Sequence, residues 1–311
     1  MKRMVTTLAV VMMLVLTAAC SAQAENPELE PSSEKPVVES NAADTKLVDT
    51  VIKFEANAED PWAGALTPGL DYLTLVNRNH PYEFSGPYDR NLHERGNMVT
   101  FADAVDGDLI QLEKGAFAAF TLLKVYLDNY CDMQIGIYDA YRDYDTQLGY
   151  YTNSLRMFYG DLKDDPSYDG ARDWQSRNPL AEPGYSETHT GLLLNVVIKH
   201  PKNTEDLANE SADTPDWEWY TETPERTATI ERFKILHENL ADFGFIDRFP
   251  AGKEEWTGVP NEPYQIRFVG SSKIAHEIMD NGLSLEEYLG ETEKFGLNYE
   301  PSAETLEKYL P

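Results

Sequence analysis

The sequence is poor in cysteine and in basic residues. Its 311 residues include two cysteines, Cys20 and Cys131, which excludes a fold held together by disulfides and a zinc site built from cysteines. Only 26 lysine and arginine residues stand against 54 acidic ones, so the net charge is −28 and the chain lacks the basic face that binding to nucleic acid requires. The apolar fraction is 41%, including 11% aromatic residues. We therefore expect a folded, acidic protein without nucleic-acid partners.

The N-terminus has the pattern of an export signal. Lys2 and Arg3 precede an apolar run at 4–18 that is too short to span a bilayer comfortably. The run leads into Leu-Thr-Ala-Ala-Cys, which resembles a bacterial lipobox, and this resemblance implies that Cys20 is lipidated and becomes the first residue of the mature chain. The alternative is cleavage after Ala24 and soluble secretion. We predict an exported cell-envelope lipoprotein attached to the membrane through Cys20.

Composition divides the chain into segments. After the signal, Glu, Pro, Ser, Asn and Ala dominate, with too few apolar residues to fold, and regular hydrophobic patterns begin near residue 71. The predicted segments are a signal peptide at 1–19, a disordered acidic tether at 20–50, a lead-in at 51–70, a globular domain at 71–290 and a C-terminal tail at 291–311. Within the domain, long acidic loops are expected at 161–183 and 201–223, and their role is open. The oligomeric state is also open.

Hydrophobic periodicity predicts a mixture of helices and strands. Apolar residues at three- and four-residue steps favour helices, whereas alternation and short apolar runs favour strands. Helices are expected near 117–127, 224–240 and 271–282, and from Ser284, which opens a capping box; strands are expected at 133–137, 191–198 and 266–269. Because the helices and strands follow no regular βαβ alternation, we predict the α+β class.

Four stretches of the domain carry motifs. They read LVNR at 75–78, DAYRDYDTQ at 139–147, PGYSETHTGLLLN at 183–195 and, within 244–270, the series GF, RFP, GK, TG and EPYQIRFVG. In order and spacing these stretches resemble the VanY-type D-alanyl-D-alanine carboxypeptidases, zinc metallopeptidases that trim peptidoglycan stem peptides. The resemblance implies a Hedgehog/DD-peptidase-like fold for residues 71–290, with a small antiparallel sheet flanked by helices.

The resemblance also assigns roles to individual residues. Glu262 stands at the position of the family's general base, and Arg142 at that of the arginine that faces the scissile carbonyl. Ser186 matches the residue that contacts the substrate carboxylate, and Gln147 and Tyr185 line the same region. An arginine suits such a site because its guanidinium can grip a carboxylate with two hydrogen bonds.

The metal positions depart from the family pattern. By resemblance, the family's zinc ligands, two histidines and an aspartate, correspond to Thr188, Asn195 and Gln265. Zinc prefers imidazole, thiolate or carboxylate, and a hydroxyl with two carboxamides supplies neither charge nor basicity. His189 lies one residue away, and in an extended segment its side chain would point to the opposite side. We therefore predict no bound metal and no cofactor.

Three functions follow from these residues. The first, which we expect, is a non-catalytic lipoprotein that binds the end of a peptidoglycan stem peptide or a related wall ligand. The second is an active D-alanyl-D-alanine carboxypeptidase with an atypical metal arrangement. The third is a structural or partner-binding lipoprotein whose pocket is filled by an ion pair of Arg142 and Glu262. We expect inactivity because Glu262, without a metal-bound water to activate, cannot drive the family's hydrolysis.

Overall fold

The structure is a computed structural model that describes residues 60–84, 97–102, 109–161, 180–199, 224–295 and 301–310. All four motif stretches fall within these ranges. The predicted signal peptide, the tether with Cys20, most of the acidic loop at 161–183 and the whole of the one at 201–223 lie outside them. In the part of the chain that is described, no helix is long and apolar enough to cross a membrane.

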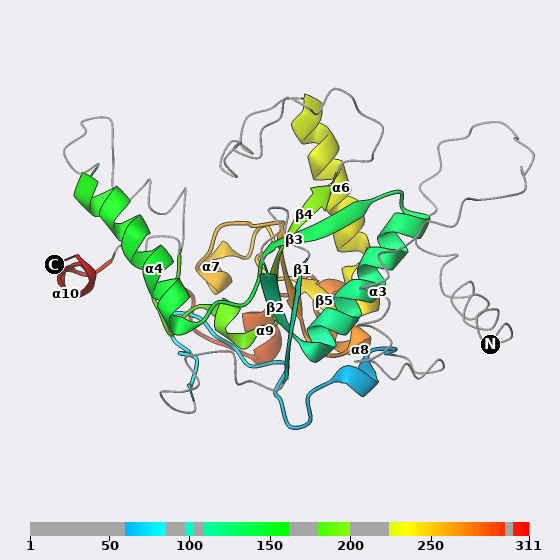
Figure 1. Ribbon diagram of the computed structural model, residues 1–311, viewed down its shortest axis with the longest axis horizontal. Helices are drawn as coiled ribbons and strands as arrows, with labels where there is room; N and C mark the ends of the chain where they lie inside the picture. The colour runs from blue at the N-terminus through cyan, green and yellow to red at the C-terminus, as the bar shows by residue number, and fades with distance from the viewer. Residues whose placement is uncertain are drawn as a thin grey trace, which may run out of the picture.

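A four-stranded antiparallel sheet forms the centre of the fold (Figure 1). Its strands, in their order across the sheet, are β3 (Gln134–Asp139), β4 (Leu193–Lys199), β6 (Gln265–Phe268) and β5 (Phe245–Asp247). Each strand runs antiparallel to its neighbours. The predicted α+β class, with a small antiparallel sheet flanked by helices, is confirmed.

Helices surround this sheet, and a second, two-stranded sheet leads into the first long helix (Figure 1). The helices are α3 (Lys114–Tyr130), α4 (Tyr144–Leu155), α6 (Pro224–Leu240), α7 (Glu254–Thr257), α8 (Ser272–Met279), α9 (Leu285–Leu289) and α10 (Ala303–Tyr309). The shorter turns are η1 (Ala63–Ala65), η3 (Arg156–Asp161), η4 (Glu187–Thr190) and η7 (Ala241–Phe243). The two-stranded sheet pairs β1 (Met98–Ala102) with β2 (Leu109–Glu113).

The two faces of the central sheet differ in chemistry. Leu194 on β4 and Ile266 on β6 are fully buried in the main hydrophobic core, which α3 and α6 cover. Side chains of successive strand residues point to opposite faces, so Asn195 and Gln265 face away from that core. These two residues are paired across the strands. The alternation therefore places polar side chains together on the face that α3 and α6 leave uncovered.

The predicted elements are found with small shifts of their ends. The helix expected at 117–127 lies within α3, the one at 224–240 is α6, and Ser284 forms the predicted capping box at the start of α9. Helix α4 was not predicted, because few apolar residues mark its buried side. Strand β3 is also more buried than a simple alternation suggests, since Gly136 lies between two buried isoleucines.

Residues on both sides of 71–290 pack against the body. Trp62, in the predicted lead-in, is 1% exposed, and its indole N–H donates to the carbonyl oxygen of Gly270 at 3.2 Å. Helix α10, in the predicted tail, packs on α4. The ring centroids of Tyr309 and Tyr151 lie 5.2 Å apart in this contact. The packed body therefore reaches beyond the predicted boundaries at both ends.

Candidate ligand-binding site

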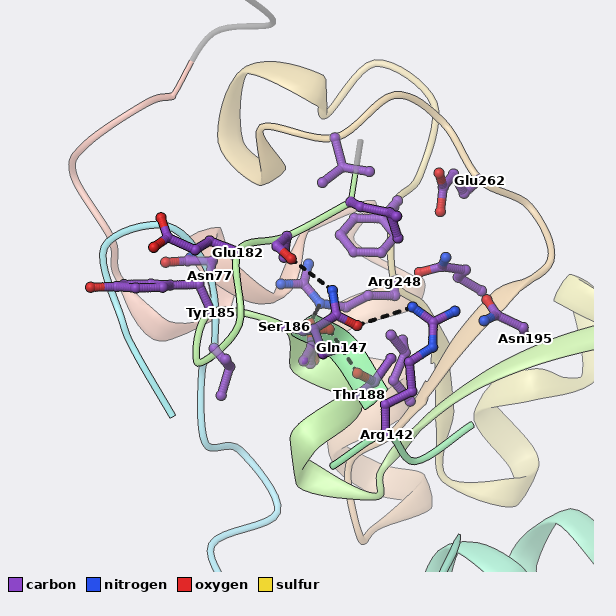
Figure 2. Close-up of a pocket in the computed structure, with 18 of the residues that line it drawn as sticks. Asn77, Arg142, Gln147, Glu182, Tyr185, Ser186, Thr188, Asn195, Arg248 and Glu262 are labelled. Atoms are coloured by element: carbon purple, nitrogen blue, oxygen red, sulfur yellow. Dashed lines mark hydrogen bonds and ion pairs between the residues drawn. The ribbon is translucent and has the colours of Figure 1, made fainter. Parts of the chain in front are cut away.

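A cavity of about 560 Å³ opens on the polar face of the central sheet. Strand β4, turn η4, the start of α4 and the segment that precedes β6 contribute its walls (Figure 2). The cavity brings together all the residues predicted from the motifs, namely Arg142, Gln147, Tyr185, Ser186, Thr188, Asn195, Glu262 and Gln265. Segments far apart in the sequence thus meet at one site.

Arg142 is held in one wall by three neighbours. One of its terminal N–H groups donates to Gln147 Oε1 at 3.1 Å (Figure 2). Another pairs with the carboxylate of Asp139, and the guanidinium lies 4.5 Å from the centroid of the Tyr150 ring. Gln147 is itself fully buried and donates to the carbonyl oxygen of Ala181 at 2.7 Å. The Nε of Arg142 is buried without a partner among the described residues. The guanidinium is therefore held in place by contacts at both of its terminal nitrogens.

Ser186 and Thr188 lie side by side at the base of the cavity. Their hydroxyl oxygens are 2.7 Å apart and share a hydrogen bond, and both side chains are buried (Figure 2). Before them, the backbone N–H of Tyr185 donates to the carbonyl oxygen of Glu182 at 2.8 Å and closes a turn. Glu262 lies at the other end of the cavity from Tyr185 and Glu182 (Figure 2).

Four buried charged residues support the cavity floor. Glu187 accepts a hydrogen bond from Arg248 Nε at 2.5 Å and another from Arg267 Nε at 2.6 Å. Arg248 also donates to both oxygens of Glu286, at 2.7 and 3.1 Å. All four side chains are at most 3% exposed. The two positive and two negative charges balance, which is the condition under which buried charges are tolerated.

The two buried arginines differ in pKa. Burial lowers the pKa of the Arg248 guanidinium, but the carboxylates of Glu187 and Glu286 outweigh this and raise it above its ordinary value. Burial also lowers the pKa of Arg267, and the carboxylates of Glu187 and Asp71, opposed by the neighbouring charge of Arg248, do not restore it. Arg267 is instead satisfied by the carbonyl oxygens of Phe268, Tyr72 and Thr74.

The three positions that we predicted to correspond to the family's zinc ligands, Thr188, Asn195 and Gln265, carry side chains that suit zinc poorly. The hydroxyl of Thr188 is engaged with Ser186, and the amide N–H of Asn195 donates to Asp139 Oδ2 at 3.3 Å. With Gln265, these positions present neutral oxygen and amide groups, which bind zinc poorly. Among the residues that the structure describes, no three His, Cys, Asp or Glu side chains cluster as a metal site would require. The residues present do not fit the metal.

His189 is held by two hydrogen bonds to backbone groups. The segment around it is the 3₁₀ turn η4 rather than the extended chain that we expected, so its side chain is turned from that of Thr188 by the helical rotation. Its Nε2 accepts a hydrogen bond from the N–H of Gly184 at 3.0 Å, and its Nδ1 lies 2.8 Å from the carbonyl oxygen of Arg142. These partners fix a neutral ring, with Nδ1 as the donor. The imidazole ring thus links the backbone at Gly184 to the backbone at Arg142.

The third predicted function, a protein with a filled pocket, assumed an ion pair between Arg142 and Glu262. The ion pair described for Arg142 is instead formed with Asp139, which stands three residues earlier at the end of β3. Asp139 was not predicted as a site residue, although it lies in the same motif. Glu182 and Lys308 also line the cavity and pair with each other at 2.9 Å. No sequence pattern links Lys308 to the site, because it comes from the predicted tail.

Comparison with known proteins identifies relatives of one kind. The family model described as "VanY: D-alanyl-D-alanine carboxypeptidase" matches residues 110–271. A D-alanyl-D-alanine carboxypeptidase of Enterococcus faecalis is 31% identical over 173 residues, covering 49% of this chain and 62% of that protein. The bifunctional D-Ala-D-Ala dipeptidase and D-Ala-D-Ala carboxypeptidase VanXYC of Enterococcus gallinarum is 29% identical over 111 residues, covering 35% of this chain and 48% of that protein. The chain thus spans about half of the length of these curated relatives.

Solved structures with a similar fold include a VanY D,D-pentapeptidase in complex with Zn(II). It is 23% identical, with a TM-score of 0.49, and the match covers 71% of this chain and 100% of that one. The LD-carboxypeptidase LdcB is 22% identical, with a TM-score of 0.49, and the match covers 76% of this chain and 90% of that one.

Proposed function

Because the chain belongs to the VanY family of D-alanyl-D-alanine carboxypeptidases, we propose that it is an exported, non-catalytic member that binds the end of a peptidoglycan stem peptide. The observation that supports this most directly is a formed cavity that keeps Arg142, Ser186 and Glu262 but has neutral side chains at the metal positions. The groups that would hold a peptide end are present, and those that would hold zinc are not.

The chemistry of the walls suits a short peptide terminus. A cavity of about 560 Å³ is in the range of sites for small ligands, which combine apolar surface with a few fixed polar groups. Arg142 supplies a positively charged donor that is already oriented by Gln147 and Asp139, so little ordering is needed when a carboxylate or carbonyl binds. Ser186 adds a hydroxyl at the base. Binding without hydrolysis follows if no group activates a water molecule.

The export part of the proposal comes from the N-terminal sequence. A basic pair, an apolar run and the lipobox-like segment that ends at Cys20 favour a lipoprotein of the cell envelope. Attachment there would hold the binding domain beside the cell wall, where stem-peptide ends are found. Mass spectrometry of the mature N-terminus tests this part separately, because a lipidated Cys20 and a free N-terminus at Glu25 have different masses.

The central test combines binding and turnover. The purified domain is loaded with zinc, dialysed and assayed for bound metal, for D-alanine release from diacetyl-L-Lys-D-Ala-D-Ala and for calorimetric binding of the same peptide. We expect no stoichiometric metal, no release and measurable affinity. Arg142→Ala should weaken binding at least about 10-fold, since a charge-assisted hydrogen bond contributes about 1.5–3 kcal/mol.

The matched control is Arg156→Ala, which removes an exposed arginine outside the cavity and should leave the affinity unchanged. Stoichiometric zinc with chelator-sensitive release of D-alanine would show that the chain is an active carboxypeptidase and would refute the proposal. Absence of binding, with a loss of stability in Arg142→Ala, would favour a structural role.

A further inference from the structure

One end of the cavity carries a positive and a negative side chain that stand outside the four motif stretches. Glu182 lies at the end of the cavity that is away from Asn195 and Glu262, and Lys308 lines the cavity with it (Figure 2). The Nζ of Lys308 donates to Glu182 Oε1 at 2.9 Å. Lys308 belongs to α10, which is outside the residues that the family model matches. This chain therefore adds a charged group to the cavity from its own C-terminal helix.

Both charged groups are held in place by the protein. Tyr309, the neighbour of Lys308 in α10, is 8% exposed and packs against Tyr151 of α4, with ring centroids 5.2 Å apart. Its hydroxyl donates to the same oxygen of Glu182, Oε1, at 2.8 Å. The backbone carbonyl oxygen of Glu182 accepts from the N–H of Tyr185, so the carboxylate extends from a closed turn. The two charges are thus in position before a ligand binds, which reduces the ordering that binding requires.

The two charged groups keep capacity for a ligand. The hydrogen bonds from Lys308 and Tyr309 both go to Glu182 Oε1, so Oε2 can accept another. An ammonium has three N–H donors, and the contacts of Lys308 with Tyr309 and Glu182, which also raise its pKa, leave at least one donor for a ligand. The side chain of Lys308 is 56% exposed and that of Glu182 is 22% exposed, so a bound molecule can reach both.

A ligand group with a single charge does not suit this end of the cavity. An ammonium that approaches Glu182 also meets the like charge of Lys308, and a carboxylate that approaches Lys308 meets that of Glu182. A group that carries both charges on one carbon can pair with both side chains at once. Because partly exposed ion pairs contribute little stability, rearranging this one around a ligand costs little. The ammonium and carboxylate of an amino-acid end have the required charge pattern.

We propose that Glu182 and Lys308 bind a zwitterionic amino-acid end on the ligand, with Glu182 accepting from its ammonium and Lys308 donating to its carboxylate. This inference rests on the proposed function and names the class of stem peptide. Arg142 and Ser186, which would hold the peptide end, line the same cavity, so one peptide can contact both places. A diaminopimelate side chain at the third position of the peptide ends in an ammonium and a carboxylate on one carbon, whereas a lysine side chain ends in an ammonium alone. The chain should therefore prefer stem peptides of the diaminopimelate type.

Peptides that differ only in the third side chain test this inference. The probes are L-Ala-γ-D-Glu-X-D-Ala-D-Ala, where X is meso-diaminopimelate, the same residue with its side-chain carboxylate amidated, or L-lysine. With the full wild-type chain, calorimetry should give about 5- to 10-fold tighter binding of the first probe than of the other two, as expected for partly exposed ion pairs. Equal affinity for the three probes would overturn the inference and leave the proposed function standing. If none of the probes binds, the proposed function fails and this inference fails with it.

Substitution of Lys308 identifies the positive group. Lys308→Gln should reduce the preference for the diaminopimelate peptide to less than about 2-fold, and Lys308→Glu should reverse it in favour of the lysine peptide, because two carboxylates then face the ammonium. Lys308→Arg retains the charge and should retain the preference. The control is Lys294→Gln, which should also retain it, because Lys294 forms a similar exposed ion pair with Glu255 but does not line the cavity. A preference that persists in both Lys308→Gln and Lys308→Glu would assign it to another group and refute the inference.

Discussion

Glu187 is the residue on which the support of the cavity depends most. Its two carboxylate oxygens hold two different arginines, Arg248 at 2.5 Å and Arg267 at 2.6 Å, and all three side chains are at most 3% exposed. Glu187→Gln keeps the shape but removes the charge, which leaves two guanidiniums facing one remaining carboxylate, Glu286. Breaking a buried ion pair from one side costs about 3–5 kcal/mol. The loss of two charge-assisted hydrogen bonds, at about 1.5–3 kcal/mol each, gives a decrease in the free energy of unfolding of the same order.

This loss should be visible in unfolding experiments. For a domain of this size we expect the melting temperature to fall by about 6–20 °C, at roughly 2–4 °C for each kcal/mol, and the midpoint of denaturation in urea to fall with it. Glu255→Gln is the control, because Glu255 is 69% exposed and its pair with Lys294 is a surface contact, so no shift is expected. A double variant, Glu187→Gln with Arg267→Met, should lose less stability than the sum of its single changes. A loss below about 1 kcal/mol for Glu187→Gln would refute the reasoning.

Two further predictions concern stability. Burial lowers the pKa of His276, but its hydrogen bonds to Asp242 and Asp280 outweigh this and raise it. Its protonation therefore stabilises the fold fully below about pH 6.5, a contribution lost as the pH rises through the folded-state pKa. His276→Gln should flatten this part of the pH dependence in urea titrations, and an unchanged curve would contradict the assignment. The buried carboxylate of Glu113 caps α3 and accepts a hydrogen bond from the hydroxyl of Tyr72. Glu113→Ala should therefore lower the free energy of unfolding by about 3–5 kcal/mol in the same assay. A loss below about 1 kcal/mol would count against that role.

The sequence predicted the fold well because the family motifs and the hydrophobic periods agree. The helices of the core, the central strands and the capping box at Ser284 are local patterns, so they could be read from neighbouring residues. Apart from α4, the main unpredicted features are contacts between residues far apart in the sequence. Trp62 packs beneath Gly244, where a side chain in place of the glycine hydrogen would come within 2.9 Å of the indole, and no local pattern predicts that contact. Lys308 likewise reaches the cavity only through the packing of α10 on α4.

The site shows the same division. Arg142, Ser186 and Gln147 could be predicted because they stand in motifs, but what each one contacts could not. The ion pair of Arg142 is the contact for which the prediction and the structure differ most. A sequence with Arg142 and Glu262 at family positions suggests that they pair, whereas the structure pairs Arg142 with Asp139. This leaves Glu262 out of that ion pair and orients the amide of Asn195.

Alternation along the strands explains how such a site can change while the fold persists. On β4, Leu194 is buried in the core and Asn195 faces the cavity; on β6, Ile266 and Gln265 divide in the same way. Because the two sets lie on opposite faces, substitutions at the cavity positions leave the packing against α3 and α6 intact. The strand residues that pack the core are therefore distinct from those that line the cavity. The fold of this chain therefore follows from its core residues, whereas its function depends on a few side chains on the other face of the sheet.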